Sequence, residues 1–339
     1  MRLLAQKTAT IYLVVLGMSG LLYFVYTTIP ILLLLLIAII LAVTLDPLVQ
    51  TLMRRGIRRS LSIAVSLSLV IAIIIVIIGM IATPLVSEGS KFAQAGPQTL
   101  DALTSNSYLH ALNSQYGIID YFKKYILQIP SSFLHNGAST FVLISGIAGS
   151  VSSFIIILIL TLFLLIEGPS AWHGILSLMS RPFARRIRVV GDKSAHAVRG
   201  FVSGNLFISL IAGTITLVTL LIMHVPYPYA LAALVALFDL IPLVGAAAGT
   251  VVVGVIALSQ GITAAAVVVG VLLLYQFIEG HIIQPLVYSR SIKLSPLMII
   301  IASLVGAEVG GIVGVLLAIP VAAVLQIVVI ELASELIDD

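Results

Sequence analysis

The chain has 339 residues, of which 60% are hydrophobic and only 9% are charged, and its mean hydropathy is +1.23. A soluble domain carries roughly a quarter charged residues, so this composition excludes an ordinary soluble protein, whose surface must be covered by polar side chains. The formal net charge of +4 does not indicate a nucleic-acid partner, because the basic residues gather between apolar runs, and the absence of cysteine excludes disulfides and thiolate chemistry.

The apolar runs predict an all-α polytopic membrane protein with about eight transmembrane segments, some of them broken or re-entrant. A helix crosses a bilayer with about 20 mostly apolar residues, and the first five runs have this length or approach it. They cover residues 9–27, 29–50, 60–82, 141–167 and 203–224. The sequence "TTIP" (27–30) predicts a tight turn between the first two spans.

Two basic segments set the expected topology. "MRRGIRR" (53–59) contains four arginines, and the segment 168–199 contains six lysines and arginines. Cytoplasmic loops retain Lys and Arg, and both segments fall on one side if each span crosses once, which also places the N- and C-termini in the cytoplasm. Within the cytoplasmic arm 168–199, residues 181–193 predict a basic amphipathic helix on anionic headgroups; a regulatory site is the alternative.

The chain divides by composition into three parts. Residues 1–83 are expected to form an N-terminal three-helix membrane segment, and residues 141–339 a C-terminal membrane transport segment that includes the arm. The polar segment between them, 84–140, carries apolar residues at helical spacing and is expected to lie outside as short amphipathic helices at the interface. A connector that caps the external face is favoured over a ligand-binding domain.

The C-terminal third differs because its apolar runs are interrupted. "DLIP" (239–242) breaks the run 229–258, and Pro242 removes a backbone donor. Breaks inside a membrane persist only where protein or a water-filled cavity satisfies the freed groups, and paired broken segments point to the binding site of a transporter. A second such segment, 296–331, is laced with glycine, and "LVGAAAGTVV" (243–252) is echoed in it by "LVGAEVGGIV" (304–313).

Two topologies remain open for these segments. Two re-entrant hairpins that enter from opposite faces would place Arg290 and Lys293 in the cytoplasm, as the charge rule prefers. A single tilted crossing by residues 229–258 would leave both cations outside.

Five polar residues within or beside the apolar segments are candidate substrate- or ion-binding residues. Glu308 is the strongest, since an acid at a helix centre costs about 2.5–3.5 kcal/mol and usually faces a polar interior; the alternative is a carboxyl that only joins helices by hydrogen bonds. Asp239 adjoins the Pro242 break and either binds a cation or caps a helix. Glu279 and Gln284 lie at a span end, where they line a cavity or are solvated. Asn205 makes an interhelical hydrogen bond, which is favoured, or contacts substrate.

Small residues near Glu308 predict close helix packing. Gly306, Gly310 and Gly314 are spaced four residues apart, which places them on one face if the helix is continuous. No H-E-x-x-H zinc motif, phosphate-binding loop or G-x-S-x-G elbow occurs in the sequence. We therefore expect neither an enzyme nor a protein that uses ATP directly, and we expect no cofactor and no metal.

Four stretches of the C-terminal half are distinctive in their order and spacing: "GFVSGNLFISLIAG" (200–213), "DLIPLVGAAAG" (239–249), "QFIEGHIIQP" (276–285) and "LVGAEVGGIVGVLLAIPVAA" (304–323). Together they resemble the autoinducer-2 exporter family, also called the PerM-like permeases. The resemblance implies an inner-membrane protein with eight helices that forms a homo-oligomer, a pentamer in the family. Family members export a small signalling molecule or exchange sodium or lithium for protons.

By the same resemblance, several glycines, prolines and one acid occupy motif positions of the family. These are Pro242, Gly245, Glu279, Pro285, Gly306, Gly314 and Pro320. Together with Gly249 and Gly310, the prolines and glycines are expected to break helices or to pack closely. Ala246 replaces a proline of the family and Asn205 replaces a glutamine, so the resemblance does not extend to the solute.

The sequence therefore predicts a secondary transporter that exports a small polar solute such as a signalling molecule. A monovalent cation/proton antiporter is the first alternative, and a non-transporting oligomeric scaffold or channel is the second. The expected partners are the lipid bilayer, the solute, a proton or sodium ion, and further copies of the chain.

Overall fold

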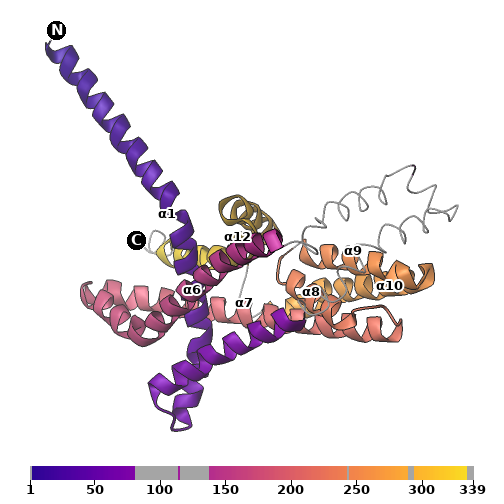
Figure 1. The fold of residues 1–339 in the computed structure, drawn as a ribbon. Helices are drawn as coiled ribbons and strands as arrows, with labels where there is room; N and C mark the ends of the chain where they lie inside the picture. The colour runs from indigo at the N-terminus through magenta and orange to yellow at the C-terminus, as the bar shows by residue number, and fades with distance from the viewer. Residues whose placement is uncertain (1, 81–113, 115–136, 243, 289–293, 334–339) are drawn as a thin grey trace. The chain divides into compact units, whose positions relative to one another are not determined.

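A computed structural model describes residues 2–80, 114, 137–242, 244–288 and 294–333, and every regular element in these ranges is helical (Figure 1). Six of the described helices are long and apolar enough to cross a membrane. Their bounds are Thr27–Arg54, Arg59–Met80, Val151–Ser177, Arg181–Ile222, Ile262–Tyr288 and Pro296–Glu331. Two shorter apolar helices accompany them, and the predicted class of all-α polytopic membrane protein is confirmed.

The first helix, α1 (Arg2–Arg54), runs without interruption through Pro30 and Pro47. The tight turn predicted at residues 27–30 is therefore wrong. Proline is tolerated inside membrane helices, and α1 continues although Pro30 has no backbone N–H to donate to the carbonyl oxygen of residue 26. The described part of residues 1–83 thus contains two helices and not three. The cytoplasmic position of the N-terminus, which was inferred from that turn, loses this support.

Helix α6 (Gly137–Ser177) and helix α7 (Arg181–Ile222) are joined by a short turn. The Trp172 indole ring of α6 lies directly against α7, because a β-carbon added to Gly191 would be 2.7 Å from its Cζ2 atom. The basic stretch 181–193 of the arm and most of the fifth predicted span, 203–224, are not separate elements, since both lie in the continuous helix α7. Buried residues of α7 recur at helical spacing, and they include Phe201, Gly204, Ile208, Ala212, Thr216 and Leu220.

The segment interrupted by "DLIP" folds as a helical hairpin. Helix α8 (Pro228–Asp239) and helix α9 (Gly245–Ala257) pack against each other after the chain reverses around Pro242. A β-carbon on Gly245 would lie 1.6 Å from the Phe238 carbonyl oxygen, and one on Gly249 would lie 3.3 Å from the Val235 side chain. Both positions therefore serve the close packing expected of them.

After the short helix η1 (Leu258–Gln260), helix α10 (Ile262–Ile278) continues into a π-helical turn, η2 (Glu279–Ile283), and then into α11 (Gln284–Tyr288). Pro285 lies in α11 and has no backbone N–H, so it cannot make a regular α-helical bond. The break expected at this proline thus takes the form of a wider helical turn immediately before it. Helices α8, α9 and α10 surround an apolar core that includes Leu231, Val235, Val253, Ala257, Val268 and Leu272.

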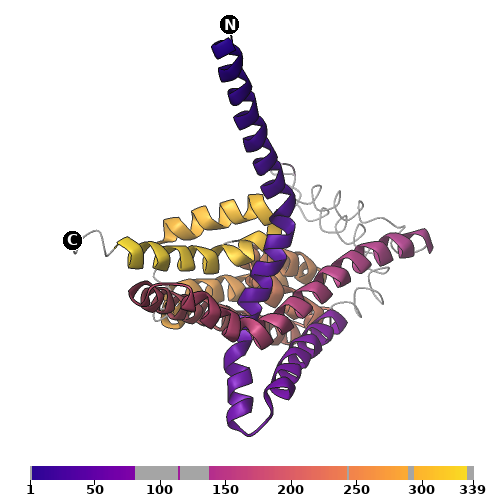
Figure 2. The same cartoon turned by 90° about the vertical axis from the view of Figure 1, so that its left-hand side faces the viewer.

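The last helix, α12 (Pro296–Ala333), is a second hairpin. Gly311 has the non-helical angles φ 58° and ψ −139°, which favour glycine, and the two arms lie side by side (Figure 2). A β-carbon on Gly306 would lie 2.4 Å from the carbonyl oxygen of Gly314 in the opposite arm. The prediction that Gly306, Gly310 and Gly314 share one face of one helix is therefore wrong, because the chain reverses between them. The helix continues through Pro320, so of the two roles expected there the structure shows no helix break.

The chain forms two compact units. Unit 1 comprises Met1–Thr51, Ile155–Arg199 and Leu294–Asp339, and unit 2 comprises Leu52–Phe154 and Gly200–Lys293. The α8–α9 hairpin belongs to unit 2 and the α12 hairpin to unit 1. The echoed sequences are not equivalent, since residues 243–252 follow the reversal of one hairpin while residues 304–313 contain that of the other.

Some predictions fall outside the described residues. They concern nearly all of the external segment 84–140, and Arg290 and Lys293, which distinguish the two topologies.

Candidate functional site

Two buried carboxylates lie in unit 2 at places where regular helix ends. Asp239 is the last residue of α8 and is 9% exposed, and Glu279 is the first residue of the π-helical turn and is 7% exposed. Among the described residues, Oδ2 of Asp239 and Oε2 of Glu279 have no hydrogen-bond partner. The two acids are close enough to interact electrostatically. A buried charge without a partner is costly, so this arrangement favours the uptake of a proton, a cation or a hydrogen-bond donor.

The π-helical turn positions Glu279 relative to Gln284. In such a turn, backbone hydrogen bonds join residues five apart, and the Gln284 N–H donates to the Glu279 carbonyl oxygen. The side chains follow the same spacing, since Nε2 of Gln284 donates to Oε1 of Glu279 at 2.8 Å. One carboxylate oxygen of Glu279 is therefore held, and the other is left available.

Asn205 connects α7 to both helix breaks. Its Nδ2 donates to the carbonyl oxygen of Leu240 at 3.2 Å, directly after Asp239, and its Oδ1 accepts a hydrogen bond from the Tyr288 hydroxyl at 3.1 Å. The Tyr288 ring stacks on Phe201 with 5.6 Å between ring centroids. Of the two roles considered for Asn205, the interhelical hydrogen bond is present in the structure, and it satisfies a carbonyl group that the helix break frees.

The structure adds residues that sequence reasoning missed. The Tyr275 hydroxyl donates to the Ile208 carbonyl oxygen at 3.1 Å. The buried Ser209 hydroxyl lies beside Asp239. Among the described residues it has no hydrogen-bond partner. The signal in the sequence was helical spacing, because Ser209 follows Asn205 by four residues and Tyr275 precedes Glu279 by four, which places each pair on one helix face.

A further polar contact ties α10 to α9. Nε2 of Gln276 donates to Thr250 Oγ1 at 2.6 Å and to the Ala246 carbonyl oxygen at 3.2 Å. This contact holds the first two turns of α9 in place directly after the reversal around Pro242.

We call the group in unit 2 the polar cluster. It consists of Asn205, Ser209, Asp239, Tyr275, Glu279, Gln284 and Tyr288. Both tyrosines lie within electrostatic range of both carboxylates. The asparagine, glutamine and tyrosine donors are engaged within the protein, whereas the two carboxylate oxygens are not. The cluster is therefore suited to a ligand that donates hydrogen bonds or carries positive charge. The described residues include no group of three or more His, Cys, Asp or Glu that could hold a metal ion.

Four of the five candidate binding residues belong to this cluster, and Glu308 does not. Glu308 is exposed in unit 1, three residues before the reversal at Gly311. The role inferred for it from the sequence, as a carrier of a proton or cation, stays a prediction.

Comparison with known proteins gives one family and several relatives. The family model described as "AI-2E family transporter" matches residues 12–334. Among the relatives, each named "Putative transport protein", YrrI of Bacillus subtilis is 33% identical over 131 residues, which cover 39% of this chain and 37% of that protein. MT0215 of Mycobacterium tuberculosis is 29% identical over 174 residues, covering 51% and 47%. YueF of Bacillus subtilis is 24% identical over 229 residues, covering 67% and 62%. The chain thus spans less than two thirds of each of these relatives.

Proposed function

The chain belongs to the AI-2E family of transporters, and from this premise we propose that it is a secondary transporter, a permease that moves a small polar solute across a cell membrane. The polar cluster of unit 2 is the proposed translocation site, with Asp239 and Glu279 as its ligand-binding carboxylates. Export is the proposed direction and a signalling molecule the proposed kind of solute, because the sequence resembles exporters.

The observation that carries this proposal is the pair of buried carboxylates with unpartnered oxygens. Ionisable groups inside a membrane are costly, face a polar interior and mark substrate or proton pathways. Both acids also stand where regular helix is interrupted, which is where transporters commonly bind substrates and ions. A purely structural role would favour a carboxylate whose two oxygens are both hydrogen-bonded, so the cluster argues against a non-transporting scaffold.

A second candidate function is monovalent cation/proton antiport. The available atoms of the cluster include two carboxylate oxygens, which can hold either a proton or a sodium or lithium ion. Competition of the two for the same carboxylates would couple their movements in opposite directions. The sequence contains no phosphate-binding loop, so either function would draw on an ion gradient or run passively.

The proposed setting is the inner membrane of a cell, with a pentamer as the proposed assembly. Both follow from the family resemblance, and the basic segments support a cytoplasmic position for the loop 53–59 and the arm 168–199.

Flux measurements on the full chain in liposomes test the proposal. Vesicles are loaded with a pH-sensitive dye and a panel of labelled polyols, sugars and amino acids, and solute release is followed with and without an imposed pH gradient. Release of a polar solute faster than from protein-free vesicles supports the permease. A pH change driven by sodium or lithium without solute release selects the antiporter. Neither flux from a folded protein, as judged by circular dichroism and size-exclusion chromatography, would contradict both functions.

A further inference from the structure

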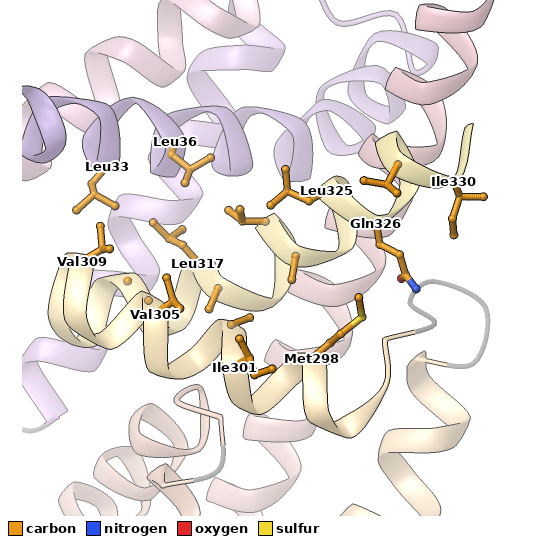
Figure 3. A pocket seen from close by; sticks show the side chains of 17 residues that line it. Leu33, Leu36, Met298, Ile301, Val305, Val309, Leu317, Leu325, Gln326 and Ile330 are labelled. Carbon is orange, nitrogen blue, oxygen red and sulfur yellow. The ribbon is translucent and has the colours of Figure 1, made fainter. Parts of the chain in front are cut away.

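An apolar groove runs along the α12 hairpin in unit 1. It lies between the two arms and the facing side of α1 and has a volume of about 790 Å³ (Figure 3). Of the described residues that line it, Gln326 alone has a polar side chain. In Figure 3 the groove extends from Leu33 and Val309 at one end to Gln326 and Ile330 at the other.

The length of this groove matches one leaflet of a bilayer. Met298 and Val309 lie eleven residues apart on the first arm, which corresponds to about 16 Å at the helical rise of 1.5 Å per residue. Half of the hydrocarbon core of a bilayer is about 15 Å. The groove therefore has the extent and the polarity of a site for one lipid acyl chain.

A second, smaller groove lies where the second arm of α12 ends. It has a volume of about 370 Å³ and is lined by Pro182, Arg185, Arg186 and Val189 of α7 and by Glu331 of α12. Nζ of Lys193 donates to Oε1 of Glu331. The side chains of Arg185, Arg186, Lys193 and Glu331 together carry a positive formal charge, and arginine side chains bind phosphate groups through several parallel hydrogen bonds.

The two grooves are lined by consecutive residues of α12. Ile330 lines the end of the apolar groove and the next residue, Glu331, lines the basic one. In the chain just before the two arginines, Leu178 is 87% exposed and Phe183 is 45% exposed. Apolar side chains next to exposed cations are typical of a helix at the membrane interface, where cations contact anionic headgroups.

We propose that unit 1 binds an anionic phospholipid, with its phosphate beside Arg185 and Arg186 and one acyl chain between the arms of α12. The lipid fills the apolar groove and links the α12 hairpin to the basic arm of α7. The charge rule places this arm at the cytoplasmic leaflet, which is where anionic lipids attract basic segments. The site does not depend on the polar cluster or on the proposed transport activity.

Lipid binding to the delipidated full chain tests the proposal, with native mass spectrometry as the readout. Phosphatidylglycerol is titrated against phosphatidylcholine, and inorganic phosphate serves as a probe without an acyl chain. We expect the double variant R185A/R186A to weaken phosphatidylglycerol binding roughly 30-fold. This corresponds to about 1 kcal/mol for each cation near the headgroups, at a tenfold change per 1.4 kcal/mol.

Two further variants separate the headgroup contact from the acyl-chain contact. Val305→Trp fills the apolar groove and should weaken binding of both lipids, whereas Leu304→Trp, at an exposed neighbour outside the groove, should leave it unchanged. Arg188→Ala, an exposed cation of the same arm outside the basic groove, is the matched control for charge. Circular dichroism confirms that each variant is folded.

Several results would overturn the proposal. An equal loss of binding in Arg188→Ala and in the double variant would show unspecific attraction to charge. Unchanged lipid binding by Val305→Trp would show that the acyl chain does not occupy the groove. Complete displacement of phosphatidylglycerol by inorganic phosphate would show that the site binds an anion and not a lipid. A change of oligomeric state in Val305→Trp with intact lipid binding would assign the groove to a second copy of the chain.

Discussion

The hydrogen bonds of Asn205 give a quantitative prediction for the stability of unit 2. Replacement by leucine keeps a side chain that branches at Cγ but removes both the bond to the Leu240 carbonyl oxygen and the bond from the Tyr288 hydroxyl. A hydrogen bond between membrane helices contributes about 0.6 kcal/mol on average and about 1.7 kcal/mol at most, and a buried group left without a partner costs about 1–3 kcal/mol. We therefore expect Asn205→Leu to lower the free energy of unfolding by about 1–3 kcal/mol.

A double-mutant cycle isolates the bond between Asn205 and Tyr288. The variants Asn205→Leu and Tyr288→Phe and their combination are unfolded in mixed micelles, with circular dichroism as the readout. We expect a coupling energy of about 0.6 kcal/mol, because Tyr288→Phe removes only the hydroxyl and keeps the ring stacked on Phe201. Tyr229→Phe, at a tyrosine that is 58% exposed, is the matched control and should be neutral.

The reasoning fails in either of two cases. A coupling energy of zero within error would show that Asn205 and Tyr288 act independently. A stability of Asn205→Leu equal to that of the wild type would show that the Leu240 carbonyl group does not need the asparagine at the helix break.

Three further substitutions test the hairpins and the exposed acid. Gly245→Ala would place a β-carbon 1.6 Å from a backbone oxygen and should destabilise by about 3 kcal/mol or more, whereas Gly270→Ala, with open space around it, should stabilise by about 0.5–1 kcal/mol; chemical unfolding of both variants provides the comparison. Gly311→Ala forces a side chain into φ 58°, ψ −139° and should cost about 1–3 kcal/mol in the same assay, so a neutral outcome would contradict the described reversal. Glu308→Gln should retain more coupled flux in liposomes than Glu279→Gln, and the opposite order would favour the role first inferred for Glu308 from the sequence.

The sequence predicted the fold class and located the two interrupted segments, 229–258 and 296–331, because these depend on local properties, but it left open whether each segment is a hairpin or a crossing. Run length and polarity identify membrane helices, and Pro242 marks where the chain leaves the helix. The turn predicted at residues 27–30 is wrong because a proline inside a membrane helix does not by itself end the helix. The glycine spacing failed because a four-residue interval indicates one face only while the helix continues, and it does not show where the chain reverses.

The sequence identified the two acids of the candidate site but not the residues that surround them. Asp239 and Glu279 stood out as ionisable residues at the ends of apolar segments. Their neighbourhood depends on contacts between distant parts of the chain, since Tyr288 and Asn205 are 83 positions apart and Asn205 and Leu240 are 35 apart. Serine, tyrosine and glutamine also occur in membrane helices as packing residues, so Gln276 gave no signal, and Ser209 and Tyr275 were indicated only by their four-residue spacing from Asn205 and Glu279.

The most direct test of the central claim measures flux through the full chain in liposomes after neutralisation of the two buried acids. Asp239→Asn and Glu279→Gln keep the shape of each side chain and remove its charge, and Glu167→Gln, at an exposed acid of α6, is the control. Solute release and cation-driven pH change are both recorded for proteins that show wild-type helicity and assembly. The account predicts that each cluster variant loses coupled flux while the control keeps it. Wild-type flux in both cluster variants would contradict the assignment of the polar cluster as the translocation site.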